Sequence, residues 1–213
     1  KVSIRFENSM SQPTQNVEFA DPITYMQMHN EAVRTRDPLG FLPYSQGKIE
    51  NTIAGKNPNV YPQTDWQDEL IKKRTMNQRL NLNMSGGGKV ARYYIAGSAT
   101  KDNGILKVDD ANDFNSNIDL KRYLIRSNIN INVTNTTEAV VRVHGTFDDY
   151  RGPIQGGREM YQAIMRTNPV LFPAVYDPDA AHANTQHTLF GNYGTGNYIN
   201  PYAELVRGYK EYS

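Results

Sequence analysis

A regular alternation of polar and apolar residues in SNININVTNTTEAVVRVHGTF, residues 127–147, constrains this chain more than any other feature. Three asparagines alternate with Ile129, Ile131 and Val133, the run stops at a small polar turn, and the alternation then resumes. Successive side chains of a β-strand point to opposite faces, so the pattern gives each strand one polar and one apolar face. The fold must therefore provide two different environments for the two faces.

The same period-2 pattern predicts five β-strands along the chain. Their approximate bounds are residues 1–10, 75–85, 89–100, 118–133 and 137–150. The segment at 89–100 is the least regular of the five. Gly86, Gly87 and Gly88 are predicted to close one hairpin, and residues 134–136 another. Turns this short fix antiparallel pairing and register.

The remaining connections are long, and they alternate with the short turns. They span residues 11–74, 101–117 and 151–205. Two helical patterns occur in them: one starts at Asp21 as N-cap with Pro22 at the first position, and the other starts at Thr64 or Asp65 and ends in basic residues. Loops of this length are unusual in a compact domain unless they have a function.

Composition excludes several classes of protein. Hydrophobic residues make up 38% of the 213 residues and the mean hydropathy is −0.67, which is lean for one dry core. A net charge of +1 gives no basic excess for nucleic acid, and the absence of cysteine excludes disulfides and thiol chemistry. No apolar run reaches the roughly 18 residues of a membrane helix, and the start KVSIRFENSM lacks a signal-peptide core. The chain is expected to be a piece of a longer polypeptide.

Two architectures bury the apolar face of such a sheet. In a soluble or surface-attached β-sandwich the apolar faces of two sheets pack together. In a transmembrane β-barrel the apolar face contacts lipid and the polar face lines a wet lumen. The predicted strands, at about 10 to 14 residues, suit a tilted membrane strand of about 9 to 11 residues better than the ~5 to 6 typical of soluble strands. Alternating short periplasmic turns and long extracellular loops also favours the all-β barrel, and a carbohydrate-binding sandwich is the alternative.

The barrel interpretation assigns a direction to each strand residue. The predicted lumen-facing residues are Arg79, Asn81, Asn83, Arg92, Arg126, Asn128, Asn130, Asn132, Arg142 and His144. Tyr93 and Tyr123 fall on the apolar faces, where they are predicted to join an aromatic girdle at the lipid interface. This assignment depends on parity alone, because a β-bulge would reverse every residue beyond it.

Seven runs of the sequence carry a resemblance to a known family. They are FADPITYMQMHNEA, TDWQDELIKKRTMNQRLNLNMSGGG, YYIAGSATKDNGIL, NSNIDLKRYLIRSNININV, VRVHGTFDDYRGPI, MRTNPVLFPAVY and NPYAELVRGYKEYS. In colinear order they resemble the SusC-like TonB-dependent transporters of the Bacteroidota outer membrane. The resemblance implies that residues 1–213 form the first part of a 22-stranded barrel, immediately after a plug domain. The plug, the TonB-binding segment and the remaining strands are outside this sequence.

The resemblance also implies a function and partners. Such transporters import a nutrient, a glycan or in some systems a peptide, across the outer membrane with energy delivered through TonB. A SusD-like surface lipoprotein covers the barrel mouth as a lid, and the pairs often form dimers. Sugars stack on aromatic rings. The predicted loop aromatics for solute or lid contact are Tyr44, Tyr61, Trp66, Tyr161, Tyr176, Tyr193 and Tyr198, and the alternative is that they pack the loops.

Other candidate sites are weaker. An acidic loop suggests calcium but does not follow the EF-hand order, so a solvated loop is favoured. Its residues are Asp102, Asn103, Asp109, Asp110, Asn112 and Asp113. His182 and His187 are predicted to be surface histidines without a metal. The N-x-S/T patterns at Asn83, Asn132 and Asn135 are not expected to be glycosylated. No nucleophile, acid–base pair or phosphate loop is found, so no enzyme, catalytic residue or cofactor is predicted.

Overall fold

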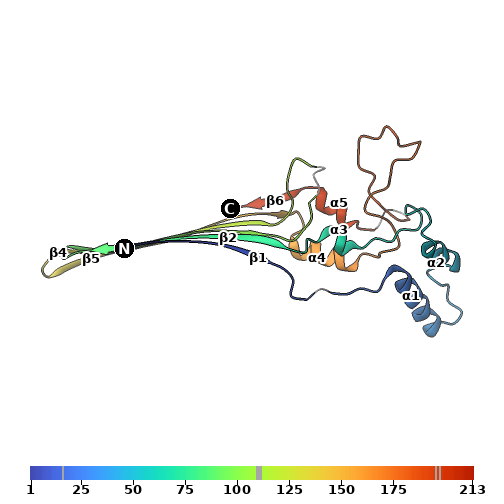
Figure 1. The fold of residues 1–213 in the computed structure, drawn as a ribbon, viewed down its shortest axis with the longest axis horizontal. Helices are drawn as coiled ribbons and strands as arrows, with labels where there is room; N and C mark the ends of the chain where they lie inside the picture. Colours follow the sequence, from blue (N-terminus) through green and yellow to red (C-terminus); the bar gives the residue numbers. More distant parts are fainter. Residues whose placement is uncertain (16, 109–111, 195, 197) are drawn as a thin grey trace.

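A single antiparallel sheet dominates the computed structural model, which describes residues 1–15, 17–108, 112–194, 196 and 198–213 (Figure 1). Its strands are β1 (Val2–Ser11), β2 (Thr75–Gly87), β3 (Ala91–Asn103), β4 (Asp119–Thr134), β5 (Thr137–Pro153) and β6 (Tyr209–Tyr212). They pair in chain order, β1-β2-β3-β4-β5-β6. The sheet is open, with β1 at one edge and β6 at the other.

The number of strands differs from the prediction of about five. The structure has a strand at each of the five predicted segments, and β6 is a sixth, paired with the end of β5. The Tyr150 and Tyr212 rings stack with centroids 4.8 Å apart, and Arg151 pairs with Glu211 at 3.0 Å. A four-residue strand is too short for its alternation to be recognised in the sequence.

The first hairpin turn also lies later than predicted. Gly86 and Gly87 belong to β2 and pair with Tyr93 and Arg92 of β3, so only residues 88–90 connect the strands. Glycine at position 86 leaves room for an aromatic neighbour, because a Cβ atom there would lie 2.6 Å from the Tyr93 hydroxyl. The strand continues through the two glycines because the Tyr93 ring covers the first of them.

Helices occupy the long connections and gather at one end of the sheet (Figure 1). They are α1 (Pro22–Arg36), α2 (Gln46–Ile53), α3 (Trp66–Leu70), α4 (Gly157–Arg166) and α5 (Pro201–Val206). The Asp21 carboxylate accepts hydrogen bonds from two backbone amides of α1, as an N-cap does. Asp65, rather than Thr64, caps α3 in the same way. This helix is shorter than predicted, and the basic residues that follow lie outside it.

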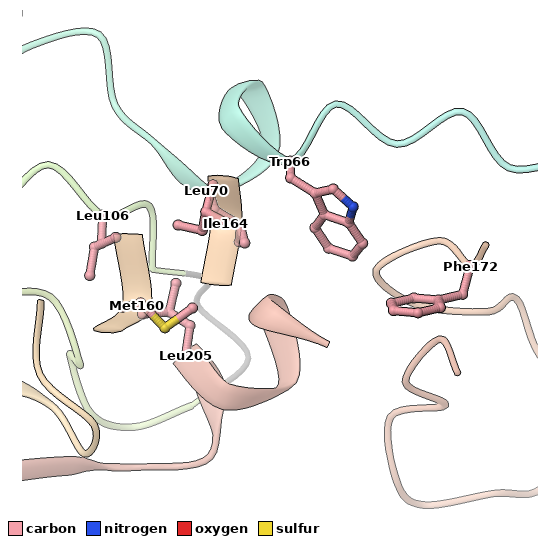
Figure 2. Packing of buried hydrophobic residues seen from close by; sticks show 7 residues of the cluster. All are labelled: Trp66, Leu70, Leu106, Met160, Ile164, Phe172 and Leu205. Atoms are coloured by element: carbon pink, nitrogen blue, oxygen red, sulfur yellow. The ribbon is translucent and has the colours of Figure 1, made fainter. Parts of the chain in front are cut away.

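Two small hydrophobic cores hold the helices together. The larger contains Trp66, Leu70, Leu106, Met160, Ile164, Phe172 and Leu205, and Figure 2 shows these side chains converging from α3, α4, α5 and two loops. The smaller contains Met26, Tyr44, Ile49 and Val170. The Tyr44 hydroxyl accepts a hydrogen bond of 2.7 Å from Asn168, and the indole nitrogen of Trp66 donates to the carbonyl of the same residue. Asn168 therefore links the two cores.

The long strands contribute none of the buried hydrophobic residues of these cores. On the apolar side of the sheet Ile4 is 70% exposed, Ile125 54% and Phe147 67%. The β-sandwich interpretation requires a second sheet packed against this side. Among the described residues there is none. No described helix combines the length and apolar character needed to cross a membrane.

Candidate functional site: the two faces of the sheet

Cross-strand register gathers the predicted polar residues on one side of the sheet, which we call the polar face. All ten candidates lie on it: Arg79, Asn81 and Asn83 from β2, Arg92 from β3, Arg126, Asn128, Asn130 and Asn132 from β4, and Arg142 and His144 from β5. Residue pairing runs without a shift from β1 to β5 until Asn132, where the register changes before Thr134. Because the bulge lies at the hairpin end, it does not reverse the parity of the strands.

Ion pairs stand toward the two ends of the polar face. Toward the helices, the Arg122 guanidinium contacts both carboxylate oxygens of Asp148 at 2.8 and 3.0 Å. This is the two-pronged geometry that makes arginine–carboxylate pairs specific. Toward the hairpin turns, Arg92 contacts Glu138 at 3.4 Å, and Asn130 donates to the same carboxylate at 2.9 Å.

Between these ion pairs lies a cationic stretch. Arg126 stands directly opposite His144, and Arg142 directly opposite Asn128. Within the described part of the chain, neither arginine forms an ion pair or a side-chain hydrogen bond. Both arginines and the histidine are exposed. The centre of the polar face thus presents guanidinium groups to solvent.

Besides Asn130, two more of the predicted asparagines are already engaged by the sheet itself. Asn83 accepts a hydrogen bond of 3.1 Å from the Tyr94 hydroxyl, and Asn132 donates to the Lys89 carbonyl at 2.8 Å. The second bond ties the two hairpin ends together. These two side chains have a structural role that the alternation pattern does not reveal.

The opposite side, which we call the apolar face, carries the alternating apolar residues. Tyr93 and Tyr123 lie on it, as predicted. One cross-strand row contains Phe6, Leu80, Ala99, Tyr123 and Phe147, and the next row toward the helices contains Asn8, Gln78, Lys101, Lys121 and Asp149. Lys121 pairs with Asp149 at 3.9 Å. From Tyr123 to Ile131 the band measures roughly 26 Å along β4, at about 3.3 Å per residue.

Two of the seven loop aromatics follow the alternative interpretation, in which they pack the loops. Tyr44 is 4% exposed and Trp66 3%, so their rings are not available to a solute and pack the two cores instead. Their packing partners include residues from distant segments, Val170 for Tyr44 and Phe172 for Trp66. Tyr61 is partly buried and its hydroxyl accepts a hydrogen bond from Asn51.

The other aromatic candidates are partly or largely exposed. Tyr161, Tyr193 and Tyr198 are 42 to 49% exposed, and Tyr176 is partly buried against the larger core. The Tyr193 and Tyr198 rings meet edge to face at 5.7 Å, and Tyr198 lies 6.4 Å from Phe172. An aromatic path therefore runs from the larger core to the surface of the helical end.

A cavity of about 330 Å³ opens beside α5. Phe190 and Glu204 line it together with Arg207, whose guanidinium contacts the Glu204 carboxylate at 3.1 Å. None of the seven predicted aromatics lines it. Phe190 had no distinguishing sequence signal, since it lies in a loop without periodicity.

The acidic loop and the histidines show no metal geometry in the part of the chain that is described. Asp109 and Asp110 lie outside the described residues. Elsewhere, no group of three or more metal-ligating side chains is present. His182 has an acidic neighbour that the sequence interpretation overlooked: its Nδ1 lies 2.6 Å from the Asp179 carboxylate. Hydrogen bonds from His182 hold the pKa of Asp179 below its ordinary value.

Comparison with known proteins gives one informative similarity. The chain is 27% identical to "TonB-dependent receptor P3" of Formosa agariphila over 164 residues, which is 74% of this chain. The aligned part spans 15% of that receptor. No protein-family model matches the chain. The similarity supports a relation to TonB-dependent receptors.

Proposed function

We propose that this chain is the early barrel segment of a SusC-like TonB-dependent transporter of the bacterial outer membrane. The observation that carries the proposal is the pair of faces: a continuous apolar face on one side and ten polar candidates on the other. An apolar surface this large needs a partner. In a 22-stranded barrel lipid would cover it, and the polar face would line the lumen.

The edges of the apolar face support the same orientation. The row that contains Phe6, Tyr123 and Phe147 lies where the apolar band gives way to lysines and aspartates. Aromatic girdles flank the apolar band of outer-membrane barrels, about 25 Å tall. The short turns would lie on the periplasmic side, and the helical connections would lie outside the cell.

The transported solute in this proposal is a nutrient, a glycan or a peptide, with energy delivered by TonB through a plug domain outside this sequence. The name of the relative, a TonB-dependent receptor, supports this energy source. A SusD-like lipoprotein would cover the helical end, and two such pairs would form a dimer. Leu39 and Phe41 support a protein partner there, because they are 96% and 100% exposed on a turn held by Asp37.

Adjacent positions on β4 provide the test of orientation. Asn130→Cys and Ile131→Cys are introduced into the full-length protein in native membranes. We expect Asn130→Cys to react with a water-soluble thiol reagent and a probe on Ile131→Cys to be quenched by a lipid-phase quencher. If a probe at position 131 is shielded from both water and lipid, the apolar face packs on protein, and the carbohydrate-binding sandwich becomes the better interpretation.

A further inference from the structure

Six arginines of the described strands lie on the polar face. Arg5 pairs with Glu7, and Arg79 stands opposite the same Glu7. The other four fall into two groups. Arg92 and Arg122 each contact a carboxylate. Among the described residues, Arg126 and Arg142 contact none. All four are on the same face of the same sheet, so the difference comes from their neighbours and not from the fold.

No acidic side chain stands beside Arg126 or Arg142 in its cross-strand row. The cross-strand row of Arg126 is Asn83, Ala96 and His144, and the row of Arg142 is Ser85, Tyr94 and Asn128. Neither row contains Asp or Glu. The nearest carboxylates on β5, Glu138 and Asp148, are already held by other arginines. The centre of the polar face is therefore net positive.

An anion bound between the two arginines would relieve the repulsion between their charges. Arg126 and Arg142 are diagonal neighbours on adjacent antiparallel strands, within reach of long side chains, and like charges at such positions repel. A guanidinium group offers a planar fork of N–H donors that matches a two-oxygen acceptor. Two forks side by side are suited to a carboxylate or a sulfate.

From this geometry we infer that Arg126 and Arg142, with His144 beside them, bind an oxyanion carried by the transported solute. The solute class is then an acidic oligosaccharide, bearing carboxylate or sulfate groups. Asn128, opposite Arg142, would bind its hydroxyl groups. The inference rests on the proposed function, because it requires the polar face to line the solute path.

Binding to the purified full-length transporter in detergent tests this assignment. The probes are a sulfated galactan oligosaccharide, its chemically desulfated counterpart and an oligogalacturonate, measured by calorimetry. The variant is the double substitution Arg126→Gln and Arg142→Gln. The matched control is Arg92→Gln with Arg122→Gln, which removes the same charge from the same face but only from arginines that already have partners.

We expect the wild-type protein to bind an acidic probe at least 10-fold more tightly than the desulfated one. The test variant should lose that preference, and the control should change affinity less than 3-fold. Preference for the sulfated galactan over the oligogalacturonate identifies sulfate as the bound group, and the reverse identifies carboxylate. An Arg126→Lys and Arg142→Lys variant keeps the charge and should retain part of the affinity. This result would distinguish a loss of solute binding from a failure of the transporter to fold.

Two results would overturn the inference. One is that neither acidic probe binds the wild-type protein more tightly than the neutral one. The other is that the test variant loses stability while acidic-probe binding is unchanged, which would mean that carboxylates elsewhere in the polypeptide neutralise the arginines. Either result leaves the transporter proposal standing if Asn130→Cys and Ile131→Cys still report water on one face and lipid on the other.

Discussion

Single buried asparagines organise the connections at the helical end. Asn30 donates to the Tyr44 carbonyl at 2.7 Å and accepts from the Tyr44 amide at 3.0 Å, so it fixes the turn before α2. Asn200 does more, because its amide nitrogen donates to the carbonyls of Ala174 and Gly191 while its oxygen caps α5. Each of these two side chains bonds to backbone amide and carbonyl groups where the regular pairing of a helix or a sheet is lacking.

Asn200→Ala should destabilise the α5 region by about 2 to 4 kcal/mol, because it strands two carbonyls and two amides in a buried place. Hydrogen exchange of the α5 amides in the full-length protein measures this local opening. The matched control is Asn57→Ala, which removes one exposed turn hydrogen bond and should change local stability by under about 0.5 kcal/mol. Equal effects of the two changes would contradict the role given to Asn200.

Tyr44 makes the smaller core sensitive to alkaline pH. Burial raises the pKa of Tyr44 to about 12, although the hydrogen bond from Asn168 opposes the shift. In the unfolded chain the phenol ionises near 10. The contribution of the buried, protonated Tyr44 to the free energy of unfolding is therefore complete below about pH 10. It is lost as the pH rises toward about 12. The tyrosinate absorbance of wild type minus Tyr44→Phe should titrate near 12, and a midpoint near 10 would show that the ring is not buried.

The residues of the sheet were easier to predict from sequence than those of the loops. Parity placed Asn128 and Ile129 on opposite faces, and the register kept that assignment valid because its shift lies beyond Asn132, at the hairpin end. For Tyr44 and Trp66 the sequence left solute contact and loop packing both open, because burial of a loop side chain depends on segments such as residues 168–172, which carry no periodic pattern.

At the scale of elements, neighbouring valines on β5 separate the two faces. Val140 is 47% exposed on the polar face, and Val141 is 48% exposed on the apolar face. If lipid covers the apolar face, Val141→Lys should cost up to about 2 to 4 kcal/mol and reduce assembly into the outer membrane, whereas Val140→Lys should be tolerated. Membrane-integrated protein and urea unfolding measure the two effects. Similar losses for both variants would argue that water, or protein, covers both faces.

Element boundaries show where local sequence signals succeed. The N-cap and Pro22 predicted the start of α1, because a capping carboxylate and a fixed proline φ act within one turn. The end of α3 was predicted too late, and α2, α4 and α5 were missed. Short helices depend on the cores for stability and not on their own propensity, so their sequences carry little signal.

For the whole molecule, the pairing of β2 with β3 and of β4 with β5 followed from connection lengths, since short turns require adjacent antiparallel strands. The pairing of the other neighbouring strands did not follow, because long connections join them. The packing of the helices into a unit at one end of the sheet did not follow, because it depends on contacts between residues more than 90 positions apart, such as Trp66 with Phe172. The proposal that the sheet is part of a closed barrel predicts lipid at position 131, which the Ile131→Cys probe measures.

The pairing of strands in chain order has a consequence for the order of folding. The β2–β3 and β4–β5 hairpins close over a few residues, whereas β1 reaches β2 only after residues 12–74. Each doubling of loop length costs about 0.6 kcal/mol of closure entropy, so the difference of more than four doublings amounts to roughly 2.5 kcal/mol. The hairpins should therefore form first and present β2 as a template. The β1 strand, and β6, which reaches β5 only after residues 154–208, should dock after the hairpins.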